Sequence, residues 1–78
     1  MSRIRYKKDR HIIDVIWSDD KLTVIVDGTE RVVYPRIQGY NGSVSYVVYI
    51  PEKGHNKQLT ISKSIVEAVK EGISNGNE

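Results

Sequence analysis

Few residues of this 78-residue chain combine the types and spacing that catalysis or metal binding needs. Its two histidines, His11 and His55, belong to no metal-ligand pattern, and the sequence has no cysteine. Asp19, Asp20 and Asp27 fall in predicted turns, where an Asp side chain bonds to its own backbone. No calcium-loop spacing and no glycine-rich phosphate loop is present. We therefore expect a protein that is not an enzyme and that needs neither a metal nor another cofactor.

Binding is the better prospect, beginning with the positive charge at the N-terminus. The formal net charge is only +2, but five of the 12 Lys and Arg residues lie among the first ten residues, with Asp9 as their one acidic neighbour. Such a segment can neutralise phosphates. It can equally form a charged edge strand that resists aggregation. The candidate contacts in this segment are Arg3, Arg5, Lys7, Lys8 and Arg10.

A second candidate surface is rich in tyrosine. The chain has five tyrosines, one tryptophan and no phenylalanine, and Tyr suits half-exposed contact surfaces because its ring is apolar and its hydroxyl polar. If a helix covers one face of the predicted strand 43–50, Val47 and Tyr49 point out from the other. Arg, Gln, Tyr and Ser side chains on such a face can contact phosphates or base edges. Ordinary sheet packing with polar residues outward is the alternative. The candidate contacts on this face are Arg36, Gln38, Tyr40, Tyr49 and Lys57.

These side chains must be positioned by strands, because apolar and polar residues alternate along much of the sequence. Residues 3–7 alternate as in a strand with one wet face, and HIIDVIW at 11–17 has the β-branched composition of a buried strand. Asp19-Asp20 predicts a turn. Pro35 should end a strand or lie at a sheet edge, and residues 51–56 are expected to form a polar loop.

Two hairpin turns are predicted at Asp27-Gly28 and Asn41-Gly42, because glycine accepts a positive φ without steric cost. At the first turn we prefer a three-residue connection. It pairs Val24 with Val32, whereas a two-residue connection would pair Val24 with Arg31.

One helix is expected at the C-terminal end. Ser64 and Glu67 have the spacing of a capping box, and Ser62 is a competing N-cap. The helix can end at Gly72 or at Gly76. Its apolar stripe, which repeats every four residues and can pack on a sheet, consists of Ile65, Val69 and Ile73.

The predicted fold class is α+β, an antiparallel meander sheet of five to six short strands with one C-terminal helix packed on one face. A small curled barrel plugged by the helix is the alternative. We expect one domain. Its segments are a basic arm or edge strand at 1–10, the sheet at 11–61, the helix at 63–73 and a frayed tail at 74–78. No apolar run is long enough to cross a membrane and no secretory signal is recognisable, so a cytoplasmic protein is expected.

Residues 36–73 carry a strand–turn–strand–helix motif with an aromatic on one strand at Tyr46, a turn at Lys53-Gly54 and a basic residue on the next strand at Lys57. Ile61-Ser62 then leads from the strand to the helix cap, and Glu67-Ala68 lies in the helix. This segment resembles the DNA-binding domain of plant ethylene-response factors, whose relatives include the arm-binding domain of tyrosine integrases. The resemblance implies a three-stranded sheet whose outer face lies in the DNA major groove.

We therefore predict a small non-enzymatic DNA-binding protein, encoded by a phage or mobile element, that contacts DNA through the sheet face and the basic N-terminal segment. The alternative is a protein-binding inhibitor of a host or defence protein, acting through a strand edge or the tyrosine-bearing face. A structural protein that oligomerises through an edge strand is a third hypothesis. The expected partner is thus DNA or a host protein, without a membrane, and the expected state is a monomer or small homo-oligomer.

Overall fold

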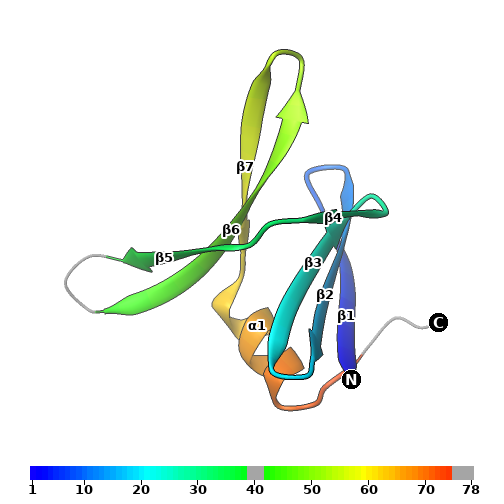
Figure 1. Ribbon diagram of the computed structural model, residues 1–78, viewed down its shortest axis with the longest axis vertical. Coiled ribbons are helices and arrows are strands. Elements are labelled where there is room, and N and C mark those ends of the chain that lie inside the picture. Colours follow the sequence, from blue (N-terminus) through cyan, green and yellow to red (C-terminus); the bar gives the residue numbers. More distant parts are fainter. Residues whose placement is uncertain (39–41, 75–78) are drawn as a thin grey trace.

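Seven antiparallel strands and one C-terminal helix build the part of the chain that the structure, a computed structural model, describes: residues 1–38 and 42–74 (Figure 1). The α+β class is therefore confirmed. The strands form two sheets, and within each sheet every strand pairs with its sequence neighbour. The four-stranded sheet contains β1 (Ser2–Lys8), β2 (His11–Ser18), β3 (Lys21–Val26) and β4 (Thr29–Arg31). The three-stranded sheet contains β5 (Tyr34–Gln38), β6 (Ser43–Glu52) and β7 (His55–Ile61), and the helix is α1 (Lys63–Lys70).

Two-residue turns decide the register of the hairpins. At Asp27-Gly28, φ is 50° and 84°, and positive φ at both positions is what a type I′ hairpin turn requires. The preferred three-residue connection is therefore wrong, and Val24 pairs with Arg31. The turn is further held by Asp27, whose Oδ1 accepts a hydrogen bond from the Ile12 N–H at 2.9 Å. Turn geometry thus outweighs the pairing of apolar side chains.

The predicted polar loop at 51–56 is also a tight turn. Lys53 and Gly54 both have positive φ, so β6 continues through Glu52 and β7 begins at His55. The strands on either side are consequently longer than the sequence suggests. Asp19-Asp20 forms the turn expected there, again with positive φ at both residues.

One apolar core lies between the two sheets and the helix. Helix α1 packs on β1 and β2 and also contacts β6. Burying each large aliphatic side chain contributes roughly 1.5–3 kcal/mol to folding. The core consists of Ile4, Ile13, Val15, Val24, Val26, Val48, Ile50, Leu59, Ile61, Val66 and Val69. Because both sheets face this core, their other faces point away from each other.

The helix begins after Ser62, so Ser62 is the N-cap and the capping box at Ser64 and Glu67 is wrong. Ser62 Oγ lies 2.8 Å from Ser64 Oγ and makes no cap bond to the backbone. At the other end the Gly72 N–H donates to the Val69 carbonyl and the Ile73 N–H to the Ala68 carbonyl. With φ of 93° at Gly72, this is a Schellman motif, and it ends the helix before residue 73.

The N-terminal segment forms an edge strand rather than an arm. Strand β1 pairs with β2 on one side. The other end of the chain contacts it, since the Arg3 N–H donates to Ser74 Oγ at 3.0 Å and the Ser2 hydroxyl donates to the Val69 carbonyl. Pro35 lies in β5, which is an edge strand of the three-stranded sheet, as its missing N–H predicts. Of the predicted tail at 74–78, only Ser74 belongs to the described residues.

Candidate nucleic-acid interface

The register of the three-stranded sheet sorts its side chains onto two faces, because directly paired residues of antiparallel strands point to the same side. Tyr34 pairs with Val47, Arg36 with Ser45 and Tyr49 with Gln58. The alternate positions of β6 and β7 belong to the core, so these pairs lie on the side away from it. We call this side the outer face, and its described side chains are Tyr34, Arg36, Ser45, Val47, Tyr49, Pro51, Asn56, Gln58 and Thr60.

Two tyrosines stand at the centre of the outer face. The rings of Tyr34 and Tyr49 meet edge to face, with centroids 5.6 Å apart and planes at 62°. Both side chains are about half exposed, at 48% and 41%. Val47 lies on the same face, as predicted, but it is only 3% exposed. The outer face therefore presents aromatic rings over an apolar base.

A hollow lies on each side of the tyrosine pair, and both hollows are lined by Tyr34 and Tyr49. The first hollow, of about 480 Å³, is also lined by Pro35, Arg36, Val47 and Gln58. The second, of about 350 Å³, is also lined by Glu30, Arg31, Val32, Pro51 and Asn56. Each hollow thus combines an aromatic wall with one arginine and one side-chain amide.

The structure brings together only some of the predicted contacts on this face. Arg36 and Tyr49 share it. Tyr40 and the side chain of Gln38 lie outside the described part of the chain. Lys57 was expected here, but it pairs with Ile50 and points to the opposite side. The reason is alternation within β7: Leu59 and Ile61 are core residues, so Lys57, two positions before Leu59, lies on their side of the strand.

The N-terminal cations lie on the four-stranded sheet instead. Arg3 and Arg5 lie on the solvent face of that sheet, and each Nε donates to Asp14 Oδ1, at 3.2 and 2.7 Å. Asp14 itself is only 5% exposed. Burial by itself would raise the pKa of Asp14, but the hydrogen bonds from Arg5 and Arg3 outweigh it and hold the pKa below its ordinary value. We call this contact of Arg3 and Arg5 with Asp14 the clamp. It was not predicted from the sequence, although the pairing of β1 with β2 places Arg5 directly opposite Asp14.

The remaining N-terminal cations are spread over different surfaces. Lys7 is exposed on the solvent face of the four-stranded sheet. Lys8 points the other way, and its Nζ donates to the Thr60 carbonyl at 2.9 Å. Arg10 is an exposed turn residue with φ of 71°. The segment therefore does not form one continuous cationic surface with Arg36.

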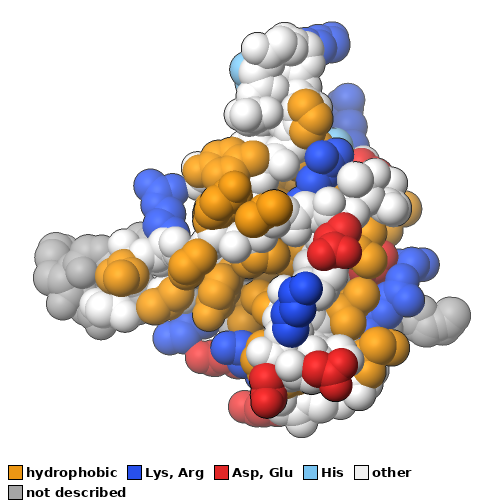
Figure 2. Space-filling model, viewed as in Figure 1, with side chains coloured by type: hydrophobic (Ala, Val, Ile, Leu, Met, Phe, Trp, Pro, Cys, Tyr) orange, Lys and Arg blue, Asp and Glu red, His pale blue; other side chains and the backbone are white. Residues whose placement is uncertain are grey.

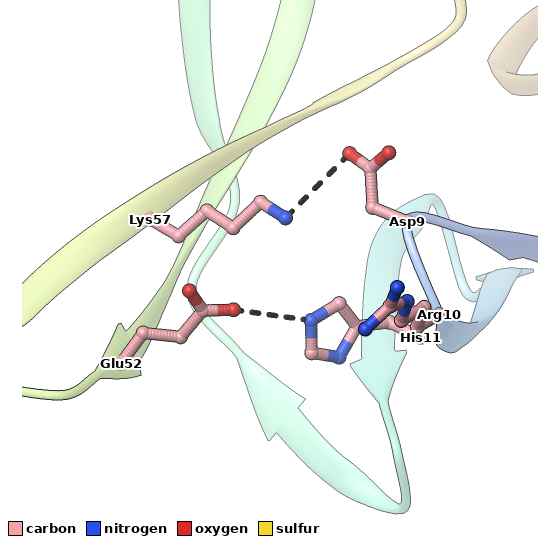
Figure 3. A pocket seen from close by; sticks show the side chains of 5 residues that line it. All are labelled: Asp9, Arg10, His11, Glu52 and Lys57. Carbon is pink, nitrogen blue, oxygen red and sulfur yellow. Dashed lines mark ion pairs between the residues drawn. The ribbon is translucent and has the colours of Figure 1, made fainter.

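A charged cluster joins the two sheets at another hollow, of about 460 Å³ (Figure 3). Glu52 and Lys57 reach from the three-stranded sheet toward His11 and Asp9 of the other sheet. The Glu52 Oε2 to His11 Nε2 distance is 3.5 Å, and the Lys57 Nζ to Asp9 Oδ2 distance is 3.8 Å. Arg10 also lines this hollow. Opposite charges meet pairwise, which suits a connection between sheets.

His11 is held in this cluster by the turn aspartate. Its Nδ1 lies 2.6 Å from Asp27 Oδ2. The hydrogen bond to Asp27 raises the pKa of His11 above its ordinary value, and it correspondingly lowers the pKa of Asp27. Apart from the turn itself, no pattern in the sequence predicts this contact. Among the described residues, no three His, Asp or Glu side chains are grouped as metal ligands.

Comparison with known proteins assigns no relative. No family model matches the chain, and no curated protein or solved structure is significantly similar to it. The resemblance of residues 36–73 to the ethylene-response-factor domain therefore stays a prediction from sequence. In the described part of the chain, no helix has the length and apolar character needed to cross a membrane.

Proposed function

We propose that this is a non-enzymatic DNA-binding protein whose contact surface is the outer face. One observation carries the proposal: β5, β6 and β7 contribute arginine, tyrosine, amide and hydroxyl side chains to this face, and none of its described residues is acidic. The side chains present are those that contact phosphates and base edges.

The arrangement around the face supports the same function. In chain order, three antiparallel strands followed by a helix is what the resemblance of residues 36–73 implies, although α1 packs mainly on β1 and β2. The outer face is the one that this resemblance assigns to DNA. The proposal is narrower than the hypothesis from sequence. Arg3 and Arg5 are engaged by Asp14 on the opposite side of the core, so we assign the phosphate contacts to Arg36 and Arg31, each of which lines one of the two hollows.

The test is a fluorescence anisotropy titration with labelled DNA, single-stranded and duplex, between about 50 and 200 mM salt. Arg36→Ala should weaken binding and reduce the slope of log K against log salt by about 1. Lys7→Ala removes a similarly exposed cation from the opposite sheet and should leave both quantities unchanged. If the wild-type protein binds neither form of DNA at the lowest salt, the proposal is wrong.

A protein-binding function is the second candidate, and the apolar surface beside β5 favours it. Figure 2 shows hydrophobic side chains gathered along β5 and the chain that enters it from β4. Val32 and Ile37 are mostly exposed. Val32 lines the second hollow beside the tyrosine pair, whereas Ile37 pairs with Val44 and lies on the other side of the sheet. Aromatic and apolar side chains with a nearby arginine are typical of the centre of a protein interface. If DNA is not bound, recovery of one defined protein from nuclease-treated host lysate, lost in Val32→Ser and Ile37→Ser variants, would support this function instead.

A further inference from the structure

We infer that the outer face binds a single strand of nucleic acid, with bases stacked on Tyr34 and Tyr49, in preference to a duplex. The inference rests on the proposed function and specifies the form of its ligand. It follows from the shape of the tyrosine pair, from the polar groups around it and from the small number of cations on this side of the molecule.

The tyrosine rings are placed for stacking. They form a ridge between the two hollows, and both rings are about half exposed. The hollows, of about 350 and 480 Å³, fall within the usual range of about 300–1,000 Å³ for small-molecule sites. A base can therefore lie against the ridge from either side. In a duplex the faces of the bases are covered by their neighbours, so only an unpaired strand offers those faces to the rings.

The polar groups complement successive nucleotides. Arg36 and Gln58 line the first hollow, and Arg31 and Asn56 line the second. Each side of the ridge thus provides a guanidinium for a phosphate and an amide for a base edge.

The charge balance argues against a duplex. Proteins that bind duplex DNA through its backbone often neutralise about 6–10 phosphates. Here two arginines line the hollows, and Glu30 adds a negative charge to the second one. Single-strand binding depends less on charge, because stacking one base on an aromatic side chain improves affinity by roughly 5- to 150-fold. The observed combination of two rings and two cations therefore suits a short single strand.

The experiment compares labelled oligothymidine of about 12 nucleotides, within the usual site sizes of about 4–16, with a duplex of the same length. We expect the single strand to bind at least about tenfold tighter, since each stacked base adds that order of affinity. Tyr34→Ala and Tyr49→Ala should each weaken binding by roughly 5- to 150-fold. The Phe variants at the same positions keep the ring and should bind within about twofold of wild type.

Two further variants control for structure and charge. Ile12 is 48% exposed, the same fraction as Tyr34, but lies on the solvent face of the four-stranded sheet, so Ile12→Ala should not change binding. Glu30→Gln removes the carboxylate from the second hollow and should strengthen binding. Thermal unfolding followed by circular dichroism shows whether each variant is folded at the assay temperature, and the Phe variants test stacking even where an Ala variant unfolds.

The outcomes separate this inference from the proposed function. A duplex bound as tightly as the single strand, or more tightly, overturns the inference while DNA binding stands. Phe variants that lose as much affinity as the Ala variants also overturn it, because the ring is then not the contact. Binding of neither form removes both proposals. Preference for oligouridine over oligothymidine supports a single strand and assigns RNA as the ligand.

Discussion

Replacing Asp14 with asparagine tests how the N-terminal cations are used. The change keeps the shape of the side chain but removes the charge that Arg3 and Arg5 share. Hydrogen bonds to charged groups contribute about 1.5–3 kcal/mol, whereas exposed ion pairs contribute about 0–1 kcal/mol. Asp14 is buried, but the arginine side chains are 42% and 51% exposed. We therefore expect the free energy of unfolding to fall by about 1–2 kcal/mol.

Thermal unfolding measures this loss. In a domain of this size 1 kcal/mol shifts Tm by about 4–8 °C, so Asp14→Asn should lower Tm by roughly 5–15 °C at neutral pH. Because the pKa of Asp14 is lowered in the folded state, its contribution is present above pH 3.8 and is lost as pH falls through the lowered pKa. The difference between variant and wild type should therefore shrink in acid.

The control is Asp19→Asn, which changes an exposed turn aspartate with a φ that asparagine tolerates. A Tm change below about 2 °C for Asp14→Asn would show that the clamp contributes nothing measurable, and the reasoning would be refuted. Asp14→Asn also removes the carboxylate charge beside Arg3 and Arg5. Because they lie on the sheet opposite the outer face, DNA affinity should not increase, and a clear increase would mean that the N-terminal cations contact DNA after all.

Three further changes test the fold and the charged cluster. Leu59→Ala should lower the free energy of unfolding by about 2–5 kcal/mol, since Leu59 is buried in the core. Thr60→Ala, on the outer face, should change it by no more than about 0.5 kcal/mol. Equal losses in chemical denaturation would contradict the assignment of the two residues to opposite faces of β7. Gly72→Ala should lower the free energy of unfolding by about 1–2 kcal/mol, because alanine is strained at the positive φ of this position. An added Cβ would meet nothing within 4 Å, so backbone strain alone should cause the loss. An unchanged Tm would contradict the left-handed conformation of Gly72 at the end of the helix. The pKa of His11 is raised above 6.5 by Asp27, so the stability that depends on the protonated ring is complete below pH 6.5 and is lost as pH rises through the raised pKa. An NMR titration should show a lower His11 pKa in Asp27→Asn, and identical values would sink this assignment.

The secondary structure follows from local patterns to a large extent. Alternation predicts β1 and β3, the β-branched run at 11–17 predicts β2, and the apolar stripe predicts α1. The division into two sheets was not predictable in this way. It depends on where the chain leaves one sheet and enters the next, at Val32 and Val33, and these residues have the same β-branched composition as a strand. The distinction arises from packing around the shared core, which acts between residues distant in sequence.

The candidate site was predictable only where it depends on alternation within one strand. Tyr49 was placed correctly because Val48 and Ile50 on either side are core residues. Lys57 was misplaced although the same alternation applies to it, because Leu59 and Ile61 belong to the core and Lys57 lies on their side of β7. Asp14, by contrast, looks like an isolated charge in an apolar strand, and its partners become evident only when β1 is paired with β2. The register between the two strands, not residue type, decides this contact.

The most direct test of the outer face as the binding surface is an NMR titration of the ¹⁵N-labelled protein with a short single-stranded oligonucleotide. We expect the largest amide shift changes in β5, β6 and β7 around Tyr34, Arg36, Tyr49 and Gln58, with little change in β1. Changes confined to β1 and its turn, or no changes at all at low salt, would contradict the assignment of DNA binding to this face.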